Sequence, residues 1–315
     1  MRGRSAPPDM VRRAGLVIPA RNQAAELARL LPALAAQIPP ENILVVDSAS
    51  SDATADVARG CGCRCISIAL KDFDHGTTRN FGARSVPGEF IVFMTPDAVP
   101  EGPATLAALL EPFQDPSVGA TYARQLPRPG ARPLERFARE FNYPPEPRVQ
   151  SLESLPRLGI KAFFLSDSCA AYRREVFERM GSFPEPCVVS EDMYMAARMV
   201  LAGFKVCYAP AARVVHSHRL SLWGQFRRNY KIGAFFHDHR WIRDRAPLGA
   251  EGLRFLKSEC AYLIREGAAF GIVEAILDAG ARWTGLHVGQ AAAALKSAWP
   301  FARRRMSARK NKEKV

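Results

Sequence analysis

Apolar and β-branched residues recur along the first half of the chain in short runs that alternate with helical patterns. The expected strands are Gly15 to Ala20, Asn42 to Asp47, Arg64 to Leu70 and Glu89 to Thr95, and the expected helices are Ala24 to Gln37, Ser51 to Arg59 and Thr77 to Ser85. Strands that alternate with helices pair in parallel through right-handed crossovers. The pattern therefore predicts an α/β fold with a mainly parallel sheet.

The second half of the pattern is less regular. A proline-rich stretch from Pro127 to Pro156 predicts a long loop with one helix near Leu134 to Phe141, and loops of that length are typical of lids or acceptor sites. The next expected elements are strands at Phe163 to Tyr172, Lys205 to Ala209 and Arg213 to His218, and helices from Arg174 and from Ser190. From Ser221 onward the pattern is helical throughout.

Charge changes at the same place as the pattern. The formal net charge is +13, from 44 basic and 31 acidic side chains; residues 1–218 contribute +2 and residues 219–315 contribute +11. We expect a flexible N-terminus at 1–14, an α/β catalytic domain at 15–218, a helical region at 219–302 and a basic tail at 303–315.

No apolar run reaches the roughly 18 to 20 residues that span a bilayer, and the first residues lack the apolar segment of a secretory signal. The seven cysteines are an odd number, which favours reduced thiols and a cytoplasmic protein. Cys61, Cys63 and Cys65 form C-x-C-x-C, which suits apolar packing better than a zinc site.

The basic C-terminal third favours a contact with anionic membrane, peripheral at the inner face of the cytoplasmic membrane. Aromatic and basic residues interleave in one expected helix, and such a helix either lies at a headgroup interface or closes the acceptor side of the core. These residues are Trp223, Phe226, Tyr230, Phe235 and Phe236, with Arg227, Arg228 and Lys231. The tail is expected to be a solvated extension or a lipid contact. Nucleic acid is not expected, because no aromatics interleave with the tail as a stacking platform requires.

Carboxylates follow two of the expected strands, where ligands of α/β sheets bind. No G-x-G-x-x-G or P-loop is present, so a nucleotide must be held differently. Asp47 is placed to accept hydrogen bonds from a base or ribose, or else caps a helix, and Asp52 fits a helix cap. Asp97 is a candidate ligand for Mg²⁺, which usually takes further oxygens from a diphosphate.

Two further groups carry candidate chemistry. His216 and His218 share one face of a strand, where one of them can complete a metal site or contact phosphate; the alternative is a polar sheet edge. Glu191 and Asp192 open a helix, whose dipole explains one carboxylate better than two. An ionised carboxylate at the mouth of a site is what a general base for a hydroxyl requires.

Seven motifs together resemble the family 2 inverting glycosyltransferases of the GT-A fold, in particular a bacterial rhamnosyltransferase-like branch. They are Val17-Ile18-Pro19-Ala20-Arg21-Asn22, Val45-Val46-Asp47-Ser48 with Ser51-Asp52-Ala53-Thr54, His75 to Ala83, Phe93 to Ala98, Cys169 to Arg173, Ser190-Glu191-Asp192 and His216-Ser217-His218. They occur in the order of the family and cover about Leu16 to Gly233. The resemblance implies a mixed, mainly parallel sheet.

The resemblance also implies roles for residues. Pro19, Arg21, Asp47, Arg79 and Asp97 would bind the nucleotide sugar. Asp97 would also bind Mg²⁺ or Mn²⁺ with His218, although Thr95 replaces the first aspartate of the D-x-D motif. Asp192 would be the catalytic base, and Glu191, His216 and Asp167 would support the site or the acceptor.

The function so implied is inverting transfer of a sugar to a bacterial glycan or lipid-linked glycan. The donor expected first is a 6-deoxyhexose such as rhamnose on dTDP. Other hexoses, a UDP-sugar donor or a polyisoprenyl phosphate acceptor remain open. Two alternative functions of a different class are a basic module that binds nucleic acid or membrane without catalysis, and a scaffold without catalytic activity.

Overall fold

The computed structural model describes residues 8–217, 220–246 and 251–312, with side chains at 9–217, 220–246 and 251–298. Contacts divide the chain into two compact units, Met1–His218 and Arg219–Val315. We call them unit 1 and unit 2 and describe each by itself.

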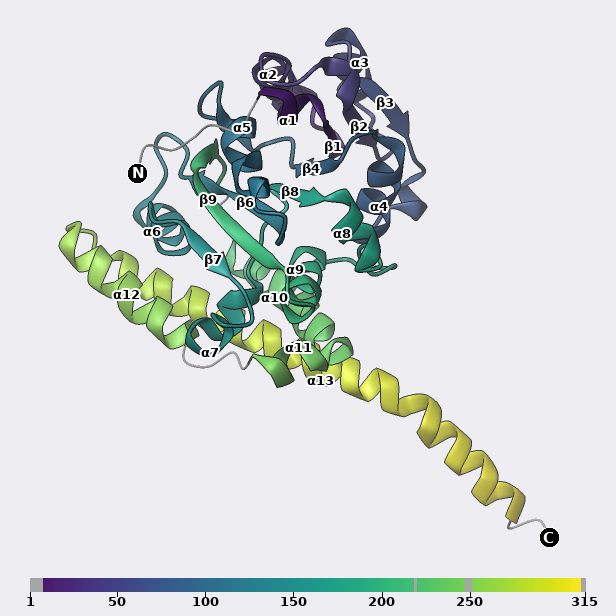
Figure 1. Ribbon diagram of the computed structural model, residues 1–315. Helices are drawn as coiled ribbons and strands as arrows, with labels where there is room; N and C mark the ends of the chain where they lie inside the picture. Colours follow the sequence, from purple (N-terminus) through teal and green to yellow (C-terminus); the bar gives the residue numbers. More distant parts are fainter. Residues whose placement is uncertain (1–7, 218–219, 247–250, 313–315) are drawn as a thin grey trace. The chain divides into compact units, whose positions relative to one another are not determined.

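Unit 1 contains a mixed β-sheet (Figure 1). Among the described residues its strands are β1 (Ala14–Ala20), β2 (Ile43–Asp47), β3 (Arg64–Ser67), β4 (Phe90–Met94), β5 (Val99–Pro100), β6 (Val118–Leu126), β7 (Arg148–Gln150), β8 (Cys169–Arg173) and β9 (Lys205–Val215). They are ordered β3-β2-β1-β4-β8-β6-β9-β5, and β7 also pairs with β9. The first four strands in this order are parallel, β8 is antiparallel to both of its neighbours, and β6 and β9 are parallel.

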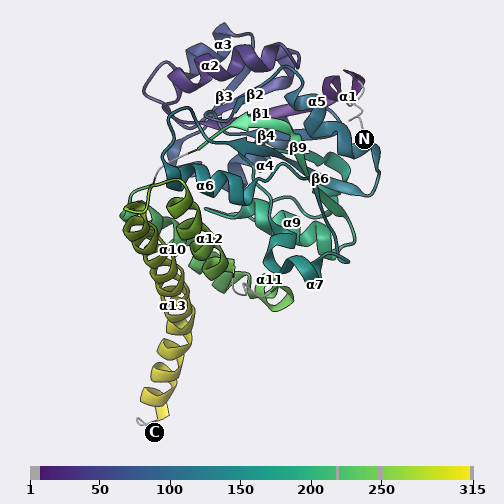
Figure 2. The same ribbon diagram turned by 90° about the vertical axis from the view of Figure 1, so that its left-hand side faces the viewer.

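Helices cover both faces of this sheet (Figure 2). The α-helices of unit 1 among the described residues are α1 (Pro8–Arg12), α2 (Ala24–Ala35), α3 (Thr54–Gly60), α4 (His75–Ser85), α5 (Thr105–Leu110), α6 (Pro133–Asn142), α7 (Leu155–Leu158), α8 (Arg174–Arg179) and α9 (Glu191–Leu201). Helices α2 and α3 lie on one face of β1–β3, and α4 lies on the other (Figures 1 and 2).

Burial on both faces explains why the central strands are apolar at every position. On β1, Leu16 and Ile18 join the core under α2, and Val17 between them is also fully buried. A parallel sheet covered on both faces requires such runs. The register pairs Ala20 of β1 with Asp47 of β2, so the two strands end together at one edge of the sheet.

The predicted alternation of the first half is confirmed, and the second half differs from the prediction. Strand β6 was not predicted, although it pairs with both β8 and β9. The two strands expected at Lys205 to Ala209 and Arg213 to His218 are one strand, β9, with an irregularity opposite Ala123 and Arg124 where Pro210 interrupts the pattern. Proline lacks the N–H that a regular ladder needs.

The N-terminal expectation also needs correction. Residues 8–14 are not a flexible segment, because Pro8–Arg12 form α1 and Ala14 begins β1. Met10 and Val11 are buried in the same core as β1 and α2. The buried contacts of Met10 and Val11 stabilise this short helix although the segment around it is rich in arginine and proline.

The cysteines of unit 1 agree with apolar packing. All seven cysteines of the chain are free, Cys63 is buried, and Cys61 and Cys65 pack against the core. Burial raises the pKa of the Cys63 thiol to about 11, which keeps it protonated.

Unit 2 is helical, as predicted, with α10 (Leu222–Asp238), α11 (Arg240–Arg245), α12 (Glu251–Arg265) and α13 (Gly271–Lys312). Helices α10 and α13 approach closely at glycines. A Cβ atom on Gly285 or Gly289 of α13 would collide with the backbone carbonyl of Phe226 or Tyr230 of α10. Among the described residues, no helix is long and apolar enough to span a membrane.

The aromatic residues of α10 differ in exposure. Trp223 and Tyr230 are exposed, whereas Phe235 and Phe236 are buried. The close contact of α10 with α13 takes up one side of the helix. The expected separate tail at 303–315 also differs, because α13 continues to Lys312.

Candidate active site

The loops after β1 and β2 hold each other at the carboxyl edge of the sheet. The Asn22 backbone N–H donates to Ser50 Oγ at 2.9 Å, and the Ser51 N–H donates to Asn22 Oδ1 at 2.8 Å. Asn22 and Ala49 have φ angles of 51° and 53°. Non-glycine residues in this left-handed region are uncommon and concentrate at functional sites.

Asp52 fixes the same loops as a helix cap, as its position suggested. Its carboxylate accepts from the N–H groups of Ala24 at 3.1 Å and Thr54 at 3.0 Å, which begin α2 and α3. The hydrogen bond from the Thr54 hydroxyl contributes most to lowering the pKa of Asp52. The Asp52 carboxylate therefore has a structural role as a helix cap.

Asp47 ends β2 with one carboxylate oxygen available. The side chain is buried, and its Oδ2 accepts from Ser67 Oγ at 3.3 Å. Oδ1 is buried without a hydrogen-bond partner among the described residues. A buried acceptor of this kind normally has a partner, so Asp47 is suited to receive a donor group of a ligand. Ala20, the last residue of β1, lies beside it, Pro19 pairs with Val46, and Arg21 is exposed in the following loop.

The turn after β4 brings Asp97 to His216. His216 Nε2 lies 3.6 Å from Asp97 Oδ1, and His216 Nδ1 lies 2.9 Å from Gln125 Oε1. Arg139 Nη1 donates to the same Gln125 oxygen at 2.6 Å. A guanidinium can only donate, so this atom is the amide oxygen and Nδ1 of His216 donates to it. In the neutral ring Nε2 then presents its lone pair toward Asp97.

This donor set fits a divalent cation that arrives with a diphosphate. A carboxylate oxygen and an imidazole nitrogen 3.6 Å apart are close enough to share one cation as ligands. The buried Thr95 hydroxyl, two residues before Asp97, has no hydrogen-bond partner in the described part of the chain. No group of three metal-ligating side chains occurs among the described residues, and a diphosphate is a usual source of further oxygen ligands for such an ion. The predicted ligand His218 lies outside the described residues.

Helix α4 is tied to the segment that precedes α9. Asp74 Oδ1 accepts from the N–H groups of Thr77 and Cys187, both at 2.9 Å. Asn80 exchanges two hydrogen bonds with the backbone of Phe183, at 2.9 and 3.0 Å. Gly76 allows the close approach, because a Cβ there would collide with the carbonyl of Pro184. The motif His75 to Ala83 therefore fixes α4 against residues 183–187.

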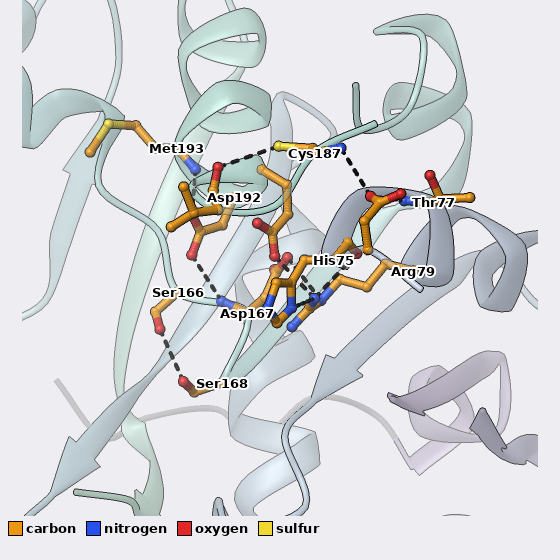
Figure 3. A network of polar contacts seen from close by, with 12 residues as sticks. His75, Thr77, Arg79, Ser166, Asp167, Ser168, Cys187, Asp192 and Met193 are labelled. Carbon is orange, nitrogen blue, oxygen red and sulfur yellow. Dashed lines mark hydrogen bonds and ion pairs between the residues drawn. The ribbon is translucent and has the colours of Figure 1, made fainter. Parts of the chain in front are cut away.

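Arg79 of α4 is buried and pairs with two carboxylates (Figure 3). Its Nη1 lies 3.0 Å from Glu191 Oε1, and its Nε lies 3.5 Å from Asp167 Oδ2. Tyr172 OH donates to Asp167 Oδ1 at 2.6 Å. Burial raises the pKa of Asp167 well above its ordinary value, and Arg79 opposes that rise. The guanidinium predicted to contact the nucleotide is thus engaged by Glu191 and Asp167.

Asp192 lies next to this network and remains partly exposed. Its Oδ1 accepts from the Met193 N–H at 2.7 Å, and its Oδ2 lies 3.5 Å from the Asp167 N–H. Burial and then the Glu191 carboxylate raise the pKa of Asp192 to about 6, while Arg79 opposes the rise. Such a carboxyl is ionised at neutral pH and basic enough to take a proton from a hydroxyl. Ser190, just before it, has a φ of 63°.

Residues 166–168 connect the two ends of the site. Ser168 O accepts from the Thr95 N–H at 3.1 Å, and Ser166 Oγ accepts from Gln125 Nε2 at 2.9 Å. Asp167 lies between them and contacts both Arg79 and Asp192. This short segment thereby links the Asp97–His216 pair to the carboxylates of α9.

Two residues that support the site were not predicted from the sequence. Gln125 lies on the unpredicted strand β6, and Tyr172 belongs to a quoted motif that gave its hydroxyl no partner. Gln125 could have been noticed as a polar residue near the end of an apolar run. The partner of Tyr172 depends on the turn that places Asp167 beside it, which no local pattern indicates.

Comparisons with known proteins show the family of the chain. The Glycosyl transferase family 2 profile matches residues 16–181. The chain is 41% identical over 253 residues to the O-antigen chain rhamnosyltransferase WbaN of Salmonella anatum, covering 80% of each chain. It is 39% identical over 279 residues to the O-antigen chain rhamnosyltransferase RfbN of Salmonella typhimurium, covering 87% of this chain and 88% of the relative.

A solved structure gives the fold. The mannosyltransferase PcManGT from Pyrobaculum calidifontis, determined in complex with GDP-Man and Mn²⁺, superposes with a TM-score of 0.61 at 22% identity, covering 94% of this chain and 90% of that one. The fold is of the GT-A type, as predicted. The chain belongs to glycosyltransferase family 2 and is a glycosyltransferase enzyme.

The buried ion pairs predict a large stability effect at Arg79. Arg79→Met leaves Glu191 and Asp167 without their cation, and removing one partner of a buried pair costs about 3–5 kcal/mol. The free energy of unfolding from urea titration measures this loss. Arg84→Met is the matched control on the same helix, because its pair with Glu185 is exposed and such pairs contribute about 0–1 kcal/mol. Equal losses in the two variants would contradict the network.

Proposed function

We propose that this protein transfers a 6-deoxyhexose, rhamnose in the first instance, from dTDP-rhamnose to a lipid-linked bacterial glycan with inversion at the anomeric carbon. Support for the sugar and the glycan comes from the two relatives, which are named O-antigen chain rhamnosyltransferases and align over most of their length. A UDP-sugar donor is the alternative to test. The reaction is placed at the inner face of the cytoplasmic membrane, where a lipid-linked acceptor is accessible.

The observation that carries the proposal is the environment of Asp192. Its pKa is raised to about 6, and the residue is partly exposed. An acceptor hydroxyl beside it gives its proton to the Asp192 carboxylate as the hydroxyl oxygen attacks the anomeric carbon. The bond from that carbon to the diphosphate breaks on the opposite face. One displacement of this kind inverts the anomeric centre.

Arg79 acts as a positioning residue in this mechanism. Its guanidinium is buried and faces Glu191 and Asp167, so it holds the start of α9 and the segment 166–168 around Asp192. Its positive charge also lowers the pKa of Asp192 and so limits the rise that burial and Glu191 cause. The nucleotide contact that the family resemblance implied for Arg79 stays a separate expectation.

The donor is held at the carboxyl ends of the strands. Asp47 offers its unpaired oxygen to the base or ribose, and Pro19 and Arg21 border the same edge. Asp97 and His216 would hold Mn²⁺ or Mg²⁺ together with diphosphate oxygens. When bound, such an ion neutralises charge that develops on the leaving diphosphate. His218 stays a candidate third ligand.

Asp192→Asn should abolish transfer and leave donor binding intact. Because an amide cannot take the proton, turnover should fall about 10²-fold or more, while the dissociation constant of dTDP-rhamnose stays within about twofold. In the wild type the rate should fall as the pH drops through about 6, because protonation removes the base. Radiochemical transfer assays and calorimetry measure the two quantities.

Asp56→Asn is the control for this experiment, because Asp56 is exposed on α3 and should transfer at the wild-type rate. If Asp192→Asn keeps more than about a tenth of the turnover, the base is another residue.

Asp97→Asn should weaken metal-dependent binding of dTDP. Loss of the carboxylate removes one ligand of the ion, so the affinity measured with Mn²⁺ should fall about tenfold or more, to the level of the wild type in EDTA. Calorimetry of dTDP binding with Mn²⁺ and with EDTA measures this, and Asp56→Asn again serves as the control. An unchanged affinity together with an unchanged response to EDTA would make Asp97 structural.

A further inference from the structure

Helix α13 of unit 2 exposes a long apolar surface. Six apolar side chains between residues 273 and 295 are about half exposed or more, from 47% for Val288 to 72% for Leu295. We call them the α13 apolar face: Val273, Ile276, Leu277, Trp283, Val288 and Leu295. At 1.5 Å per residue this face is roughly 33 Å long. Exposed apolar patches of this kind mark interaction sites.

The charged residues of the same stretch lie outside this face. They are Glu274, Asp278 and Arg282; at 100° per residue Asp278 and Arg282 lie opposite the α13 apolar face and Glu274 flanks it. Asp278 is buried, forms an ion pair with Arg282, and the Arg282 guanidinium lies 5.1 Å from the Phe255 ring centroid of α12. Glu259 of α12 is also buried. Charges thus lie between the helices while apolar side chains face outward.

Packing within unit 2 holds this face in place. Gly233 of α10 would collide with the carbonyl of Leu286 if it carried a Cβ, and Gly289 of α13 would collide with that of Tyr230. Such close contacts fix α13 against α10 and determine which side of α13 is left exposed. The apolar face is therefore a property of the packed unit and not of an isolated helix.

The width and the charge of the surface select the partner. The six side chains span an arc of about 140° around the helix, which is wider than the seam of a two-stranded coiled coil. A broad uncharged face suits a planar apolar medium. Residues 219–315 carry a net charge of +11, and the C-terminal sequence after this face is basic from Arg303 onward. Anionic phospholipid complements that charge.

We propose that the α13 apolar face is the surface by which this protein lies on an anionic phospholipid bilayer, with the helix parallel to the membrane. Trp283 and the aliphatic side chains enter the headgroup and acyl boundary, as in other interfacial helices. The proposal rests on the proposed function only in that a lipid-linked acceptor requires the enzyme to work at a membrane. It moves the predicted membrane contact from α10 to α13.

The test is flotation of the full-length chain with vesicles that contain phosphatidylglycerol, with phosphatidylcholine vesicles for comparison. The double variant Leu277→Asn with Leu295→Asn lacks two leucine side chains that would enter the bilayer, so its partition coefficient should fall about a hundredfold. Val149→Asn with Leu152→Asn is the matched control, because both residues are similarly exposed in unit 1. This control should bind vesicles as the wild type does.

Salt dependence distinguishes the contribution of the α13 apolar face to vesicle binding from that of the basic C-terminal residues. Electrostatic attraction is screened at ~0.5 M salt, but apolar insertion is not, so the wild type should keep part of its binding to phosphatidylglycerol vesicles. A chain that lacks residues 303–315 should bind more weakly at low salt and keep the same salt-resistant part. Brominated phosphatidylglycerol should quench the tryptophan fluorescence of the wild type more than that of Trp283→Phe.

Several outcomes would overturn the proposal. One is equal binding by the double variant and the wild type; another is complete release of the wild type by salt. A dimer that dissociates in the double variant, with vesicle binding unchanged, would show that a second copy covers the face. Circular dichroism checks that the variants fold. Thermal protection by dTDP-rhamnose, expected in all variants, tests the proposed function separately, since unit 1 is unchanged in the Leu277 and Leu295 variant.

Discussion

One buried guanidinium determines the arrangement of the site. Arg79 faces Glu191 and Asp167, and Asp192 lies beside them, so one cation serves three carboxyl groups in an environment that excludes most water. Burial disfavours charge on every member, and the single positive charge cannot compensate for all three. The result is a carboxyl group at Asp192 whose pKa is raised to about 6 and which is still partly exposed.

Contacts elsewhere in unit 1 fix the position of the Arg79 side chain. Gly82 brings α4 onto Val17 of β1, and the Asn80 and Asp74 hydrogen bonds tie α4 to the segment before α9. Thr95 at the end of β4 is joined to residue 168, next to Asp167. The donor edge and the carboxylates of α9 are thus parts of one connected structure, which suits a transfer between two bound substrates.

The local sequence pattern was sufficient to predict the four strands of the parallel half. The apolar runs of β1, β2 and β4 reflect burial on both faces, whereas β3 at the edge of the sheet is partly exposed. The pattern failed for β6, whose run from Val118 to Leu126 contains Arg124 and Gln125 and whose place depends on pairing with distant β8 and β9. The candidate site residues Asp47, Asp97 and Asp192 could be named from motifs. Their partners could not, because Arg79–Glu191 and Gln125–His216 are contacts between segments about a hundred residues apart. The outward apolar face of α13 likewise depended on packing through Gly285 and Gly289.

Burial and the neighbouring Glu191 carboxylate give Asp192 the pKa of a base, against the opposing charge of Arg79. Carbon-13 NMR titration of the Asp192 carboxyl, assigned with the Asp192→Asn variant, tests it most directly in the wild type and in Glu191→Gln. The account predicts a wild-type pKa of about 6 and a lower value in Glu191→Gln, because removing the neighbouring carboxylate leaves Arg79 to favour the ionised form of Asp192. An ordinary aspartate pKa of about 4 in the wild type, or the same value in both proteins, would contradict it.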